Sequence, residues 1–163
     1  MRHIISLLME NESGALSRVS GLFSARGYNI ESLSVAPTED PSLSRMTIVT
    51  SGTDEIIEQI IKQLNKLIDV VKVLDLNDGR HIERELMLVK VKTSKQYRDE
   101  VQQLSNSFGG RIIDASENIL IIEFTGTSTE LDNCLKSLNN SLVVEIIRTG
   151  ASGIGRGDRV LKI

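Results

Sequence analysis

The sequence predicts an α+β protein made of two tandem ferredoxin-like βαββαβ domains. Short β-branched apolar runs alternate with segments of helical periodicity, in the order strand, helix, strand, strand, helix, strand. The same order then recurs after about 80 residues, although the residues themselves differ. The 163 residues are 40% hydrophobic and 25% charged, which is ordinary globular composition. A unit of this kind packs two helices on one face of a four-stranded antiparallel sheet.

The first half opens with a short strand predicted over residues 3–10. Ser13 is a candidate N-cap for the helix that follows, and Gly27 stands where a glycine commonly ends a helix. The helical stripe consists of Leu16, Val19 and Phe23, flanked by Ala15 and Leu22.

The rest of the first half contains the clearest helical pattern of the chain. A two-proline turn at residues 37–41 separates two strands, and Asp54 opens the helix. The apolar stripe of this helix is predicted to comprise Ile57, Ile60, Ile61, Leu64, Leu67 and Ile68. The strands of this part are predicted over 30–36, 43–50 and 70–76.

The second half repeats the pattern after a polar linker at residues 77–80. One helix carries an apolar face from Tyr97 to Phe108, and a second is capped by Thr127 or Ser128. The strands are predicted over 83–92, 111–115, 119–125 and 142–148. We therefore expect one domain over residues 1–78 and another over residues 79–163, the latter with a glycine-rich tail.

The first strand is apolar on both faces. Ile5, Leu7 and Met9 point one way and Ile4 and Leu8 the other, because side chains alternate along a strand. The helices can cover only one of these faces. The other needs a partner, either the second half or another chain, so we expect an oligomer.

Composition excludes several classes of protein. The net charge of −3 and the absence of tryptophan argue against binding of nucleic acid. The apolar runs fall short of the ~18 residues of a membrane span. The N-terminus shows no signal-peptide cleavage site, and a lone cysteine forms no disulfide framework. We expect a cytoplasmic protein with no membrane association.

The residues offer little for catalysis. We interpret His3 and His81 as ordinary surface histidines without a metal, and Cys134, on an apolar helical stripe, as a small buried hydrophobe. The segment 149–155 is similar to the glycine-rich loop of short-chain dehydrogenases, but too few residues follow it to complete a βαβ unit. This tail is expected either to be flexible and free of contacts or to become ordered on a partner. An independent enzyme is therefore not predicted.

The loop at residues 11–16 is the best candidate for recognition. It joins a strand to a helix N-terminus, where free backbone N–H groups suit a carboxylate and Gly14 permits close approach. Asn11 and Asn29 can both donate and accept hydrogen bonds, as a zwitterionic amino acid requires. The alternative is that Ser13 only caps the helix and the asparagines only end strands.

The run from Glu10 to Ile48 resembles the small, regulatory subunits of acetolactate synthase. It contains NESGALSRV, RGYNIESL, the two-proline turn and LSRMTI in order and at the spacing of that family. The second half is more loosely similar, through MLVKV, GGRIIDAS, EFTGT, VVEIIRTG and GRGDR. The resemblance thus extends over essentially the whole chain.

The resemblance implies that residues 1–78 form an ACT domain, which pairs in a homodimer and binds an end-product amino acid at the interface. The second domain would help to engage a separate, large catalytic subunit. That subunit carries thiamine diphosphate, magnesium and FAD and condenses two pyruvates into acetolactate and carbon dioxide; no cofactor is implied for this chain. The effector residues carried over by the resemblance are Asn11, Gly14, Ala15 and Leu16 of one chain and Asn29 and Ile30 of its neighbour.

The implied function is regulatory. The chain would activate the catalytic subunit and confer feedback inhibition by valine or another branched-chain amino acid in isoleucine, valine and leucine biosynthesis. A free-standing ACT-type amino-acid sensor that controls another target is the alternative, and a small stand-alone enzyme is a third reading.

Overall fold

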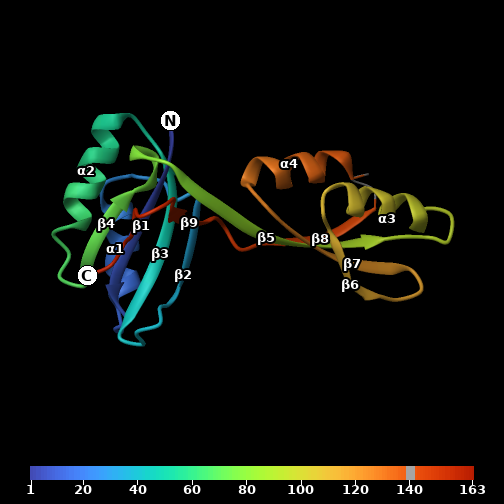
Figure 1. Cartoon of the computed structure of the whole chain (residues 1–163), viewed down its shortest axis with the longest axis horizontal. Coiled ribbons are helices and arrows are strands. Elements are labelled where there is room, and N and C mark those ends of the chain that lie inside the picture. Colours follow the sequence, from blue (N-terminus) through green and yellow to red (C-terminus); the bar gives the residue numbers. More distant parts are fainter. Residues whose placement is uncertain (139–141) are drawn as a thin grey trace. The chain divides into compact units, whose positions relative to one another are not determined.

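The computed structural model describes residues 1–138 and 142–163, which form two compact units. The first unit comprises Met1–Glu83 together with Ala151–Ile163, and the second comprises Arg84–Gly150 (Figure 1). Each unit contains helices packed on an antiparallel sheet, so the predicted α+β class and the repeated order of elements are confirmed.

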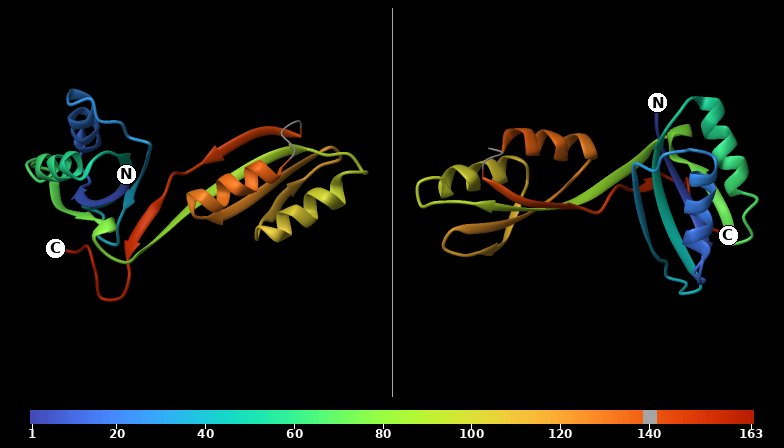
Figure 2. Two further views of the ribbon diagram at one scale, coloured as in Figure 1. Left: turned by 90° about the horizontal axis from the view of Figure 1, so that it is seen from above. Right: turned by 180° about the vertical axis from the view of Figure 1, so that it is seen from behind.

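The first unit is built on a four-stranded sheet in the order β2-β3-β1-β4. Its central strands pair antiparallel, with Leu7 opposite Met46. The strands are β1 (Arg2–Glu10), β2 (Ser32–Pro37), β3 (Leu43–Ser51) and β4 (Val70–Asp75). Helices α1 (Ala15–Ala25) and α2 (Asp54–Leu64) pack on one face of it (Figure 2). The core between them includes Ile5, Leu7, Val19, Phe23, Met46, Ile48, Ile57 and Ile60.

The ends of α1 depend on two glycines. The N-cap is Gly14, with φ of 86°, and not Ser13, whose side chain makes no capping hydrogen bond. At the other end Gly27 adopts φ of 69°, as predicted from its position. Its N–H donates to the carbonyl of Ser24, and the next N–H, of Tyr28, donates to Phe23. This is a Schellman motif, which requires the left-handed conformation that glycine tolerates.

Helix α2 is shorter than its apolar stripe suggested. Thr53 caps it by accepting from the N–H of Ile56, and the helix ends at Leu64. Leu67 still packs against the core, but Ile68 is 89% exposed and does not continue the stripe. The short 3-10 helix η1 (Leu76–Asp78) follows β4.

The C-terminal tail covers the other face of the first sheet. Ile4 packs there in a cluster with Leu76 and Ala151, and Leu8 packs with Leu161. Strand β9 (Ser152–Gly155) pairs with β5 (His81–Lys92). The tail therefore belongs with the first unit and not with the predicted domain 79–163. The second apolar face of β1 is buried by residues 151–163 of the same chain. These residues come from the second half of the sequence, which was one of the two expected partners, and not from another chain.

Close packing holds the tail in place. A Cβ on Gly153 would lie 2.4 Å from Leu76 Cδ1 and 3.2 Å from Ile4 Cγ2, so only glycine fits without movement. Further along, the Arg159 guanidinium donates to the carbonyls of Asp75, at 2.6 Å, and Leu76, at 3.1 Å. The glycine-rich composition thus allows backbone to lie directly on the sheet.

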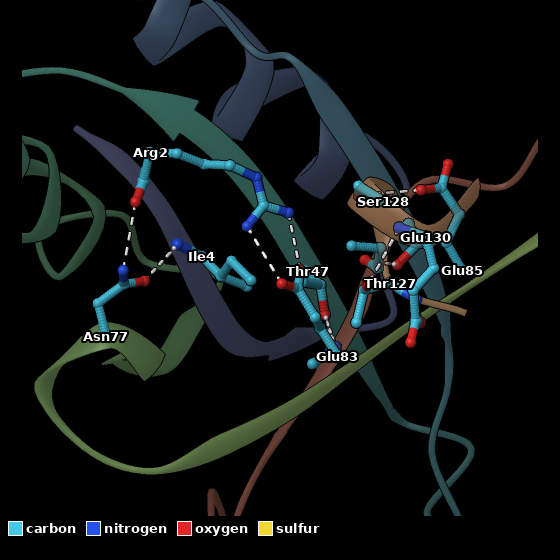
Figure 3. A network of polar contacts seen from close by, with 12 residues as sticks. Arg2, Ile4, Thr47, Asn77, Glu83, Glu85, Thr127, Ser128 and Glu130 are labelled. Carbon is cyan, nitrogen blue, oxygen red and sulfur yellow. Dashed lines mark hydrogen bonds and ion pairs between the residues drawn. The ribbon is translucent and has the colours of Figure 1, made fainter. Parts of the chain in front are cut away.

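The second unit has a sheet in the order β6-β7-β5-β8. Its strands are β5 (His81–Lys92), β6 (Arg111–Ala115), β7 (Ile119–Gly126) and β8 (Val143–Arg148). Its helices are α3 (Arg98–Ser107) and α4 (Ser128–Ser137). Thr127 caps α4 in a reciprocal capping box with Glu130 (Figure 3). Cys134 is buried in the core, as expected, and burial raises the pKa of its thiol to about 11.

Candidate functional site

The loop between β1 and α1 is fastened to the turn between β2 and β3. The Asn11 N–H donates to the carbonyl of Ser42 at 2.7 Å, and the Asn11 side-chain amide donates to the carbonyl of Pro41 at 3.0 Å. The side-chain oxygen of Asn11 makes no hydrogen bond with any described residue. Asn11 is exposed, so this oxygen remains available as an acceptor.

Gly14 is the N-cap of α1, in the left-handed conformation. Its carbonyl accepts from the N–H of Arg18 at 3.0 Å, which starts the helix. Within the described residues, the N–H groups of Gly14, Leu16 and Ser17 have no hydrogen-bond partner. Such free donors, together with the positive end of the helix dipole, favour a carboxylate.

An ion pair below the loop was not predicted from the sequence. The Arg18 guanidinium binds both carboxylate oxygens of Asp69, which is 5% exposed, and the Asp69 carbonyl accepts from the N–H of Glu10 at 2.8 Å. The hydrogen bonds between the two side chains lower the pKa of Asp69 and raise that of Arg18. A Cβ on Gly14 would lie 2.9 Å from Arg18 Nη1, so the glycine leaves a guanidinium beside the loop. The one feature of the sequence that could have indicated a cation at this loop is Arg18, which follows Gly14 by one helical turn.

Ala15 and Leu16 have different roles. Ala15 is 2% exposed and packs in the core, whereas Leu16 is 43% exposed. Ala15 therefore contributes its backbone and not its side chain to the loop surface. Leu16 therefore presents an aliphatic side chain at the surface of the loop.

Asn29 and Ile30 lie at the other end of the sheet from this loop. The Asn29 carbonyl accepts from the Thr50 hydroxyl at 2.6 Å, and Ile30 packs against the core. Glu10 pairs with residue 43 at the start of β3, whereas Ser32 pairs with residue 49 near its end. Six residues of strand span about 20 Å. One chain therefore does not bring its two groups of predicted site residues together.

His3 is a buried residue, contrary to the expectation of a surface histidine. Its Nδ1 lies 2.9 Å from Asp75 Oδ2, and Asp75 Oδ1 accepts from the N–H of Asn77. The Asn77 side chain then accepts from the N–H of Ile4 at 2.9 Å and donates to the carbonyl of Arg2 at 3.2 Å (Figure 3). The network fixes η1 to β1. No group of three metal-ligating side chains occurs in residues 1–138 and 142–163.

The second unit contains a cluster of charged side chains around the buried Glu85. Glu85 is 6% exposed and accepts two 2.9 Å hydrogen bonds from Arg148 and one from Ser128, and Arg148 also donates to Asp132 at 2.6 Å. Burial works to raise the pKa of Glu85, but Arg148 and Ser128 outweigh it and lower that pKa. Figure 3 shows Glu85 beside the start of α4. The cluster joins β5, β8 and α4.

The first unit has the strand order of a ferredoxin-like module, and its β1–α1 loop carries amides that lack a partner among the described residues. Comparison with known proteins identifies the family. Residues 5–72 match the model for the small subunit-like ACT domain of acetohydroxyacid synthase, and residues 84–157 match that for the small subunit of acetolactate synthase.

Individual relatives match over nearly their whole length. The chain is 53% identical over 163 residues to the acetolactate synthase isozyme 3 small subunit of Escherichia coli, covering 99% of this chain and 100% of that one. It is 48% identical to a probable acetolactate synthase small subunit of Methanothermobacter thermautotrophicus, covering 98% and 95%. The crystal structure of the Thermotoga maritima small subunit, 39% identical, superposes with a TM-score of 0.90 over 98% of this chain and 99% of that one.

The chain therefore belongs to the acetolactate synthase small-subunit family, which confirms the resemblance seen in its motifs. It is the non-catalytic, regulatory component of that enzyme, and membership implies a separate large catalytic subunit as its partner. No helix among residues 1–138 and 142–163 is long and apolar enough to cross a membrane.

Proposed function

We propose that this chain activates the thiamine-diphosphate-dependent catalytic subunit and makes it sensitive to valine or another branched-chain amino acid. The observation that carries the proposal is the β1–α1 loop, which presents free amides on an ACT domain of this family. Thiamine diphosphate, magnesium and FAD would all reside in the catalytic subunit. The cytoplasm, where such biosynthesis takes place, is the proposed location.

The loop suits the carboxylate of an amino acid. The free N–H groups of Gly14 and Leu16 would donate to it, and the Arg18 guanidinium beside Gly14 adds positive charge. The side-chain oxygen of Asn11 would accept from the ammonium group. The exposed Leu16 side chain would contact the aliphatic branch of the effector.

A homodimer would complete the site. The loop and the Asn29–Ile30 segment lie about 20 Å apart along β3 in one chain, so both can contact one small molecule only if a second chain supplies one of them. Strand β2 is at the edge of its sheet, which leaves one row of its backbone groups free to pair. A two-fold interface would create two equivalent sites, each with Asn29 and Ile30 from the neighbouring chain.

Inhibition then requires only that the effector bind one state of the holoenzyme more tightly than the other. A coupling of about 1–3 kcal/mol gives roughly 5- to 150-fold inhibition. Ordering two chains at one interface is a direct source of such a difference, because the effector contacts both.

Two measurements on the full chain test the proposal. Titration calorimetry with valine, leucine and isoleucine should give one effector per protomer, and sedimentation velocity should show a dimer at micromolar concentration. Mixed with its catalytic subunit, the chain should raise acetolactate formation and make it fall as valine is added. A stable 18.0 kDa monomer that binds no branched-chain amino acid would refute the dimeric site. Effector binding without any effect on the catalytic subunit would favour a free-standing sensor.

A further inference from the structure

A pocket of about 400 Å³ lies on the face of the first sheet that α1 and α2 leave open. Strands β2 and β3 form one wall and the C-terminal tail forms the other. Its volume is in the range that holds small organic ligands. The lining includes Ser34, Val35, Arg45, Thr47, Ser152 and Ile154.

Arg45 is a partly buried cation with neutral partners. Its Nε donates to the Ser6 hydroxyl at 2.9 Å and one terminal nitrogen donates to the carbonyl of Gly153 at 3.2 Å. The other terminal nitrogen, Nη1, has no hydrogen bond to any described residue, and no carboxylate of those residues lies within 4.0 Å of the guanidinium. Glu39 also lines the pocket, without forming an ion pair with Arg45.

The other perturbed arginines differ from Arg45. Carboxylate partners raise the pKa of Arg18 and of Arg148, whereas burial without such a partner lowers the pKa of Arg45. Removing a charge from water is unfavourable unless it is paired, and most buried charges in proteins are paired. Among the described residues, Arg45 therefore has neutral hydrogen-bond partners and no anionic one.

We propose that this pocket is a second ligand site, which binds a small aliphatic carboxylate through Arg45. The carboxylate would accept from Nη1 of Arg45 and from the Ser152 hydroxyl, which lies 3.3 Å from that of Ser34. Ile154 lines the same pocket and is 55% exposed. Ala36 pairs with Arg45 and so lies on the same face of the sheet, and these two side chains would contact the aliphatic part. Among the described lining residues Arg45 is the one cation, which favours a monovalent carboxylate over a phosphate.

The site is independent of the proposed effector site. Arg45 and Thr47 pair with Leu8 and Ser6, on the face of the sheet away from α1, whereas the effector loop precedes that helix. Binding at Arg45 would also bridge β3 to the tail, because Gly153 and Ser152 belong to β9. A carboxylate ligand would therefore strengthen the packing of the tail on the first unit.

Nuclear magnetic resonance with isobutyrate on the full chain tests the site. The amides of Val35, Gly153 and Ile154 should shift saturably, with millimolar affinity for so small a ligand. Isobutyramide, which has the same shape without the charge, should bind at least tenfold more weakly. Arg45→Gln should lower the affinity for isobutyrate by at least tenfold. Arg111→Gln, which removes a surface ion pair with Glu123, should leave that affinity unchanged.

Several results would overturn the proposal. Equal binding of isobutyramide and isobutyrate would show that charge is not recognised, and an Arg45→Gln chain that binds normally would remove Arg45 from the site. Shifts confined to the loop around Gly14 would assign the ligand to the effector site. If phosphate shifts the same amides with higher affinity than isobutyrate does, the ligand of the site is a phosphate and not a carboxylate. If Arg45→Gln fails to fold, the comparison of acid and amide on the native chain decides.

Discussion

Replacing Gly14 by aspartate should abolish feedback inhibition while preserving activation. The new carboxylate would stand where we propose that the effector carboxylate binds. Gly14 has φ of 86°, a conformation that costs other residues about 1–2 kcal/mol and that Asp and Asn tolerate best. The helix should persist, because an acid at its N-terminus favours the dipole.

The magnitude follows from the charges around the loop. Two like charges about 4 Å apart, at an effective dielectric near 20, repel by about 4 kcal/mol. That corresponds to about a thousandfold in affinity, since ~1.4 kcal/mol is tenfold. The Arg18 guanidinium, 2.9 Å from the position of the new Cβ, would pair with the aspartate and cancel part of the repulsion. We therefore expect a loss of affinity between about tenfold and a thousandfold.

Gly14→Asn is the matched control. Asparagine has the size of aspartate and the same tolerance of positive φ, but it carries no charge. The assay is acetolactate formation by the reconstituted holoenzyme with rising valine, together with calorimetric affinity for valine. Resistance should be strong in Gly14→Asp and much weaker in Gly14→Asn.

Three outcomes would refute this reasoning in different ways. Unchanged valine sensitivity in Gly14→Asp would mean that the effector binds elsewhere. Equal resistance in both variants would mean that bulk, and not charge, decides. Loss of activation along with inhibition would assign the loop to the interface with the catalytic subunit.

Three other predictions concern the fold. Deleting residues 151–163 should destabilise the first unit by at least about 3 kcal/mol in urea unfolding, because the apolar far face of its sheet becomes exposed; a normal midpoint would contradict the covering role of the tail. Arg148→Met should cost about 3 kcal/mol at pH 7 by leaving the Glu85 carboxylate buried without a cation. The lowered pKa of Glu85 means that its pairing stabilises the native chain at neutral pH and is lost in acid, so the cost should shrink below about pH 4. Cys134 should resist thiol reagents at pH 8 in the native chain and react on unfolding, because its thiol pKa is raised to about 11; rapid native labelling would show that the core opens.

Local sequence determined the elements of both units. Apolar periodicity predicted the strands and helices, and the glycine at position 27 predicted the end of α1. Both signals depend only on residues that are close together in the sequence. The N-cap of α1 was predicted at the wrong residue. Ser13 has the right chemistry to cap α1, but the left-handed turn at Gly14 starts that helix instead.

Contacts between distant residues required the tertiary structure. The motif around Gly14 indicated the candidate loop, but the pairing of Arg18 with Asp69 joins residues 51 positions apart. The burial of His3 against Asp75 depends on a contact over 72 positions. Neither partner carries a local signal, because an isolated arginine, aspartate or histidine usually lies on the surface.

The sequence by itself determined that β1 has two apolar faces and that something must cover the second. It also determined that the tail is rich in glycine. Only the tertiary structure decided that these two features meet, with Gly153 against Leu76 and Ile4. The physical reason is that the hydrophobic effect is non-directional and does not depend on how far apart two segments lie in the sequence, so many apolar surfaces could cover the second face of β1. Which one does so depends on steric fit, here a backbone without Cβ atoms that lies flat on the sheet.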